Sequence, residues 1–246
     1  MSRTLSAAAV VALLVSSAAH ALAAPPPART LENATDVLKE LEAIPLKGIP
    51  PAMLADAKGV VIVPRVIKAG LVVAGRGGHG VALARDANGN WGAPVFLDLG
   101  GASVGFQAGV ESTDVVLVFR SAKSLERILA GKEKLTLGAD ASVAAGPVGR
   151  AAMAGTDGKL EAEIYSYSRS RGLFAGVSLS GAVLLPDAET TAAFQKGAPA
   201  DLEKAAALAT KLTELATAKP AAEPAPAVTP AQQPPRRRLF PRPFRP

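Results

Sequence analysis

The sequence predicts an α+β domain with a strongly twisted antiparallel β-sheet, or barrel-like core, and helices at its N- and C-terminal ends. Three observations support this class. Apolar residues alternate with polar residues or glycine through the middle of the chain, and turn signals recur there at short intervals. Helical periodicity lies mainly near the two ends. A parallel nucleotide-binding sheet would need a helix between most strands, and the sequence lacks them.

Two helices are expected before the sheet. Thr30 can act as an N-cap, and the residues after it repeat at helical spacing. The apolar residues on one face of this helix are Leu31, Ala34, Val37, Leu38, Leu41 and Ile44. A second, short helix is expected to begin near Pro51 and to end before Gly59.

From Val60 the apolar period changes from helical to two, which predicts strands. Residues 60–63 are interpreted as a buried strand. Strands are also expected on either side of a tight turn at residues 76–79 and of a hairpin at residues 86–89, where Asn-Gly accepts the positive φ of such turns. Further alternation predicts strands over residues 103–110 and 113–119.

The second half of the chain continues this pattern. Ser121 can cap a helix that Gly131 stops. Two long strands are expected, over residues 135–143 and 173–185, and their glycines indicate strong coiling or close backbone approach. Asp201 can then cap a last helix, whose inward side chains are Leu208, Leu212 and Leu215.

Residues 1–24 have the layout of a secretory signal peptide. Arg3 precedes an apolar run over residues 7–15, and Ala21-Leu22-Ala23 offers a cleavage site. The run is too short to span a membrane, which takes about 20 apolar residues. The chain has no cysteine, which excludes an acylated-cysteine anchor and disulfides. We therefore expect an exported protein, periplasmic or secreted, with peripheral membrane association left open.

The remaining boundaries follow from composition. Residues 25–29 are expected to form a short linker, residues 30–218 the folded domain, and residues 219–246 a disordered basic tail rich in Pro and Arg. Without Arg3, the six basic residues of the tail and Glu223, the linker and the domain together have 20 basic and 20 acidic residues. The basic pI therefore belongs to the tail, and nucleic acid is not an expected partner.

Two motifs suggest catalysis but lack the context that it needs. Residues 75–80 match G-x-G-x-x-G, yet a strand rather than a helix is expected to follow. Residues 101–105 match G-x-S-x-G around Ser103, a hydrolase alternative, but the histidine of such a triad must come later in the chain and His79 comes earlier. We expect a protein that is not an enzyme, with no cofactor and no metal site.

Several sequence blocks resemble the SYLF domain family. The most specific are residues 138–150 and 165–179, and residues 57–60, 68–70 and 100–107 agree in order. The resemblance runs from about Thr30 to Phe194. It implies a non-catalytic domain that binds phospholipid, of the phosphoinositide type in eukaryotic members, and hence an anionic phospholipid or membrane surface as partner. We do not carry over the family's link to actin, and the protein partner is unknown.

A different class of function stays open beside this one: a structural envelope protein that binds protein or glycan partners. One departure also limits the resemblance. In eukaryotic members, lipid binding is associated with an amphipathic N-terminal helix and nearby basic residues, whereas the equivalent helix here carries Glu32, Asp36, Glu40 and Glu42 against Lys39. Anionic headgroups would repel it, so its apolar face is expected to pack on the sheet.

Candidate lipid or phosphate contacts are basic residues, because guanidinium and ammonium groups donate to phosphate. They are Arg169, Arg171, Arg150, Lys58, Lys68, Arg65 and Arg76. Arg169 and Arg171 rank first, because a spacing of two places them on one face of a strand. A membrane tether is proposed in the tail, where charge and aromatics interleave: Arg236, Arg237, Arg238, Phe240, Arg242, Phe244 and Arg245.

Overall fold

The computed structural model describes residues 24–42, 48–70, 73–104, 109–131, 133–147, 162–170, 173–176 and 179–218. Its helices are α2 (Pro27–Glu42), α3 (Pro51–Ala55), α4 (Ala122–Leu129), α6 (Ala188–Gln195) and α7 (Pro199–Thr217). Its strands are β1 (Gly59–Gly70), β2 (Val73–Ala84), β3 (Val95–Val104), β4 (Gly109–Phe119), β5 (Leu135–Thr136), β6 (Val143–Ala145), β7 (Ile164–Ser170), β8 (Leu173–Gly176) and β9 (Val183–Pro186).

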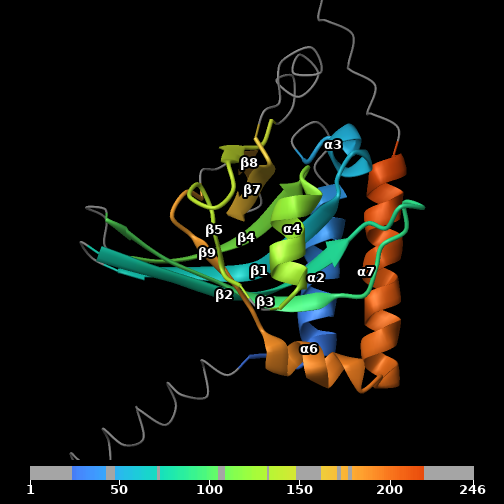
Figure 1. Ribbon diagram of the computed structural model, residues 1–246. Helices are drawn as coiled ribbons and strands as arrows, with labels where there is room; N and C mark the ends of the chain where they lie inside the picture. Colours follow the sequence, from blue (N-terminus) through green and yellow to red (C-terminus); the bar gives the residue numbers. More distant parts are fainter. Residues whose placement is uncertain are drawn as a thin grey trace, which may run out of the picture.

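The described strands form one curled sheet between helices, which confirms the α+β class (Figure 1). The order is β5-β9-β3-β2-β1-β4-β7-β6, and β8 pairs with β7. Neighbouring strands are antiparallel except for β6 and β7, which are parallel. Among the described strands β5 and β6 stand at opposite ends of this order, so the sheet is open rather than a closed barrel.

Helices α2 and α7 lie side by side on one face of the sheet (Figure 1). The sequence correctly predicts the buried residues Leu31, Ala34, Val37, Leu38 and Leu41 of α2, and Leu208, Leu212 and Leu215 of α7. Ile44, also predicted for the apolar face of α2, lies outside the described residues. Two lysines of α7 extend to the acidic side of α2: Lys204 lies 3.4 Å from Glu32 and Lys211 lies 2.6 Å from Glu42. The expectation that α2 packs within the domain is therefore confirmed.

The two predicted caps of these helices are wrong. Helix α2 begins at Pro27, so Thr30 lies inside it and is buried. Helix α7 begins at Pro199, and Asp201 lies in its first turn. Proline is favoured at the first position of a helix, because the N–H that it lacks would have no partner there and its φ is already helical.

The core has two layers, one on each face of the sheet. Val60 and Ile62 of β1 belong to the layer under α2 and α7, whereas Val61 and Val63 belong to the layer under α4. All four side chains are fully buried. A strand buried on both faces gives a continuous apolar run, which explains why residues 60–63 were predictable.

Beyond this run, β1 contains a bulge. The register with β4 shifts between Val63 and Val66, where β1 has one residue more than its partner. Past the bulge, strands β1 to β4 continue beyond the helices and extend away from the core (Figure 1). We call this part the projecting end; it consists of residues 65–70, 73–78, 100–104 and 109–113.

The predicted hairpin at residues 86–89 is confirmed. The Asp86 carboxylate accepts hydrogen bonds from the amides of Asn88 and Asn90, both at 2.8 Å, and Gly89 has φ +86°. These bonds, that of Asn90 first, lower the pKa of Asp86. The predicted end of α4 is also confirmed, with Gly131 at φ +66°. Ser121 stands at the N-cap of α4 but makes no capping bond with its side chain.

Four strand predictions need correction. No turn interrupts residues 76–79, which lie inside β2, and residues 103–110 are not one strand, because β3 ends at Val104 and β4 begins at Gly109. The two long strands are also broken. Gly138 at φ +87° and Gly181 at φ +82° adopt the left-handed conformation of turns, so alternation continues through residues that are not extended.

Residues 1–23, which include most of the expected signal peptide, and residues 219–246, the expected tail, lie outside the described residues. Within the described part of the chain, no helix combines the length and the apolar character needed to cross a membrane.

Candidate functional site

The buried carboxylate of Asp114 organises the point where the projecting end begins. Asp114 is on β4 and only 8% exposed. Its Oδ1 accepts a hydrogen bond from the amide of Arg65 at 2.9 Å, at the bulge of β1. Arg65 has φ +50°, a left-handed conformation that is uncommon for residues other than glycine. The carboxylate thus satisfies an amide that the bulge removes from the strand ladder.

The second oxygen of Asp114 binds Arg169 of β7. Both Nε and Nη2 of Arg169 lie 3.0 Å from Oδ2. The remaining nitrogen, Nη1, contacts the carboxylate of Glu40 on α2. One guanidinium therefore joins β7, β4 and α2, and two carboxylates compensate its charge.

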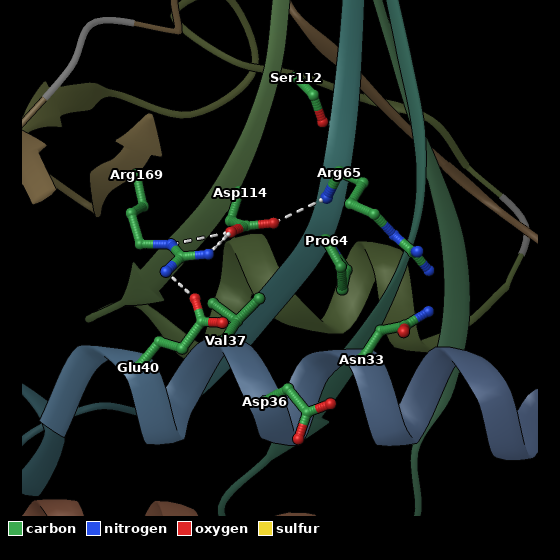
Figure 2. Close-up of a pocket in the computed structure, with 9 residues that line it drawn as sticks. All are labelled: Asn33, Asp36, Val37, Glu40, Pro64, Arg65, Ser112, Asp114 and Arg169. Atoms are coloured by element: carbon green, nitrogen blue, oxygen red, sulfur yellow. Dashed lines mark hydrogen bonds and ion pairs between the residues drawn. The ribbon is translucent and has the colours of Figure 1, made fainter. Parts of the chain in front are cut away.

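A pocket of about 300 Å³ opens beside this network, between α2 and the sheet. Figure 2 shows Asn33, Asp36 and Glu40 on the helix side, with Arg65, Asp114 and Ser112 on the sheet side. Val37, Pro64 and Arg169 complete the lining. The lining holds three carboxylates and two guanidinium groups, so it is polar with one net negative charge.

The structure separates the predicted lipid contacts into groups. Arg65 and Arg169 line the same pocket. Lys68 and Arg76 are cross-strand neighbours on the projecting end, on the face opposite to the pocket. Lys58 is exposed at the start of β1, at the other end of that strand. Arg150, Arg171 and the seven tail residues lie outside the described residues. That Arg169 and Arg171 share one face of a strand therefore stays a prediction.

Sequence reasoning missed the carboxylates of this site. Asp114 stands alone before the apolar run 115–119, and a single charge at the start of a buried strand signals a buried partner. Glu40 gave no such signal, because it is one of several acidic residues on α2. The distance in sequence also hides the pairing: Arg169 is 55 positions from Asp114.

Together with Val183 of β9, the projecting end presents an exposed and mainly apolar face on the side of the pocket. Two rows of cross-strand neighbours form it. The first row is Ser112, Ile67, Gly77, Gly100 and Val183, and the second is Val110, Ala69, Gly75 and Ala102. Ile67 is 45% exposed and Val110 78%. We call these nine residues the open face.

The catalytic motifs do not gain the context that they need. Residues 75–80 lie within β2 and open no helix, and Ser103 lies within β3 rather than at a strand-to-helix turn. His79 has a partner on the neighbouring strand: its Nδ1 lies 2.6 Å from Oδ1 of Asp98. In the described part of the chain, no three His, Asp or Glu side chains cluster as metal ligands do.

Comparison with known proteins finds one family. A model of the Ysc84 family, described as "Las17-binding protein actin regulator", matches residues 100–221. No solved structure gives a significant match.

Three relatives illustrate the sequence similarity. The SH3 domain-containing YSC84-like protein 1 of Xenopus laevis is 40% identical over 167 residues, which are 66% of this chain and 49% of the relative. The human protein of the same name is 39% identical over 168 residues, 66% of this chain and 48% of the relative. Protein YSC84 of Saccharomyces cerevisiae is 42% identical over 149 residues, 59% of this chain and 31% of the relative. The chain thus spans half or less of each.

Proposed function

Because the chain belongs to the Ysc84 family, also called the SYLF domain family, we propose that it binds membrane lipid without catalysis, through the projecting end of its sheet. One observation carries the proposal. The projecting end combines exposed apolar side chains, Ile67 and Val110, with the cations Lys68 and Arg76 on its other face. Arg65 adds a third cation at its base.

This combination has the chemistry of a membrane contact. Apolar side chains gain by leaving water for the acyl boundary, and each cation gains about 1 kcal/mol near an anionic surface. The stems of Lys68 and Arg76 allow their charges to remain at the headgroups while the strands approach the bilayer. Two apolar side chains and three cations together give a gain on the order of 5 kcal/mol, which supports reversible peripheral binding.

Helix α2 is not part of this proposal. Its apolar face is buried, and three of its acidic residues already have cationic partners: Glu32 with Lys204, Glu40 with Arg169, and Glu42 with Lys211. A helix held in this way cannot insert into a bilayer without breaking the core. We therefore assign the membrane contact to the sheet.

Arg169 also has a reduced role. Asp114 and Glu40 hold its guanidinium, so a phosphate would have to displace a carboxylate to reach it. Lys68, Arg76 and Arg65 are better placed for headgroups. The signal-peptide pattern of residues 1–24 supports an exported location, so we propose a lipid of the cell envelope as the target.

Flotation with vesicles tests the proposal. We expect the chain to float with phosphatidylglycerol vesicles more than with phosphatidylcholine vesicles, and less at high salt. Val110→Asp should reduce flotation strongly, whereas Leu202→Asp is a matched control, because Leu202 is 51% exposed on α7, away from the projecting end. The double variant Lys68→Glu with Arg76→Glu should reduce flotation with phosphatidylglycerol vesicles but not with phosphatidylcholine vesicles.

Two results would reject this function. Absence of flotation with any vesicle would leave the alternative, a structural protein that binds protein or glycan partners. Equal losses in Val110→Asp and Leu202→Asp would show that the projecting end has no special part in binding. The family description names Las17 and actin, and a protein partner for this chain would be sought next.

A further inference from the structure

The described part of the chain shows no cause for the glycines of the open face. Gly75, Gly77 and Gly100 are not among the residues with positive φ. Among described residues, no atom lies within 4 Å of the position that a Cβ on Gly75 or Gly100 would occupy, and for Gly77 the nearest is 3.9 Å away. Gly80 of the same strand differs, since a Cβ there would lie 2.6 Å from the Ile62 oxygen.

Glycine inside a strand weakens it, because the residue loses more freedom on folding and has no side chain to pack. Such glycines often mark places where another group comes close to the backbone. On the open face that group must come from outside the described fold. It must also tolerate a flat apolar floor, formed by Ile67, Ala69, Val110 and Ala102 around the glycines.

Acidic side chains of α2 lie beside this floor and favour an occupant with positive charge. Ser112 belongs to the first row of the open face and also lines the pocket under α2. Figure 2 shows Asp36 and Glu40 on the helix side of that pocket. Lys39 is the partner of Asp36, at 3.1 Å on the exposed side of α2. Arg169 already holds Glu40 and Asp114, whereas Asp36 is 53% exposed and paired with an exposed lysine, so a further cation can reach it. An occupant with flat apolar groups and a cationic group therefore fits the floor and Asp36 together.

We propose that residues 236–245 of the same chain dock on the open face. This segment reads Arg-Arg-Arg-Leu-Phe-Pro-Arg-Pro-Phe-Arg and has no acidic residue. Phe240 and Phe244 supply flat rings for the glycine floor, and an arginine supplies forked donors for the exposed carboxylate of Asp36. The inference goes beyond lipid binding and does not depend on it.

The chain between the domain and this segment is long enough. Helix α7 ends at Thr217, which leaves residues 218–235 as a connection. Fully extended, these 18 residues reach about 60 Å, about twice the 28 Å length of α7. The segment can therefore reach the projecting end without any change in the domain.

Docking would give the open face a cover that an anionic surface can remove. The arginines of the segment bind either the pocket or anionic groups elsewhere, but not both. The exposed area of Ile67 and Val110 would then depend on where the segment is bound.

Nuclear magnetic resonance of the dilute full chain at low salt, without vesicles, tests docking. We expect restricted motion of the amides of residues 236–245, and shifts at Gly75, Gly77 and Gly100 when Phe240 and Phe244 are both changed to Ala. Gly100→Val should release the segment and restore fast motion. The melting temperature of this variant should not fall, because no described atom lies within 4 Å of the position that a Cβ at residue 100 would occupy.

Charge variants give the matched control. Asp36→Lys should release the segment, whereas Glu203→Lys on the exposed side of α7 should not. Fast motion of residues 236–245 in the unchanged chain would overturn the proposal. So would shifts that disappear on further dilution, since they would mean docking on a second copy, and so would equal effects of Asp36→Lys and Glu203→Lys.

Discussion

The two halves of strand β1 share hydrogen-bonded neighbours but have opposite environments. Residues 60–63 are fully buried between two apolar layers, whereas Arg65, Ile67 and Lys68 beyond the bulge are exposed. Strands β2 and β4 pair with both halves. Backbone pairing therefore extends the sheet past its core. Apolar burial stabilises mainly the first half, although Val66 beyond the bulge is also buried, at 5% exposed. The second half is free to serve as a surface.

The bulge is the border between these halves, and Asp114 holds it. A register shift by one residue exchanges the two faces of a strand. Because of the shift, Ile67 lies on the side of the pocket and Lys68 on the other side. Without the register shift, the cationic face of the projecting end would lie on the side of α2 and the apolar face on the opposite side.

The largest expected difference compares one substitution in both halves. Ile62→Ala should lower the free energy of unfolding by about 3–4 kcal/mol, because it leaves a cavity in a fully buried site. Ile67→Ala should cost less than about 1 kcal/mol, because that side chain is already 45% exposed. Urea unfolding followed by the fluorescence of Trp91 measures both. Similar costs would show that the projecting end is packed against something.

A smaller effect is expected at the border. Asp114→Ala should cost about 2–3 kcal/mol, because the Arg65 amide and the Arg169 guanidinium each lose an acceptor. Asp114→Asn should cost less, since its amide oxygen can still accept from Arg65. Asp36→Ala is the control on the exposed side of the pocket and should be nearly neutral. The same urea experiment ranks the three variants. An Asp114→Ala variant as stable as the parent would contradict the role of Asp114 in holding the bulge and Arg169.

The smallest effect concerns the helices that cover the first half. Hydrogen bonds to Glu42 first, and then to Glu214, raise the pKa of Lys211. Its contribution to stability should be complete below the pKa of lysine in the unfolded chain, about 10.4, and be lost as pH rises through the higher folded value. The stability difference between the parent and Lys211→Met should therefore shrink above that pH.

Lys196→Met is the control for alkaline titration, because Lys196 is exposed after α6. Thermal unfolding at pH 8 and at about pH 11.5 measures both variants on either side of the lysine pKa. A difference for Lys211→Met that does not change with pH would argue that its ion pairs do not stabilise the contact of α2 with α7.

Much of the covered half was predictable from local pattern. The inward faces of α2 and α7 follow from helical periodicity, and residues 60–63 from their apolar run. The strand breaks at Gly138 and Gly181 were not predictable in this way, because alternation continues on both sides of each turn. The glycines of β2 misled in the other direction, since residues 76–79 look like a turn and lie in a strand.

The site itself was predictable only in part. A search for phosphate contacts picks out basic residues, so it found Arg65 and Arg169 but not the carboxylates that hold them. Those contacts depend on the bulge and on pairings between distant strands, which local spacing does not encode. The grouping of Lys68 with Arg76 likewise depends on the register of β1 with β2.

The pairing of α2 with α7 also constrains how the protein folds. Lys204 and Glu32 are 172 positions apart, so this contact closes almost the whole domain. During synthesis, the face of the sheet under these helices has α2 and α3 as cover early, but it lacks α7 until residues near 217 emerge. Contacts of such high sequence separation slow folding, and they leave apolar surface available to chaperones in the meantime. Because α7 is synthesised last, the core layer under α2 and α7 cannot be completed until almost the whole domain has been made.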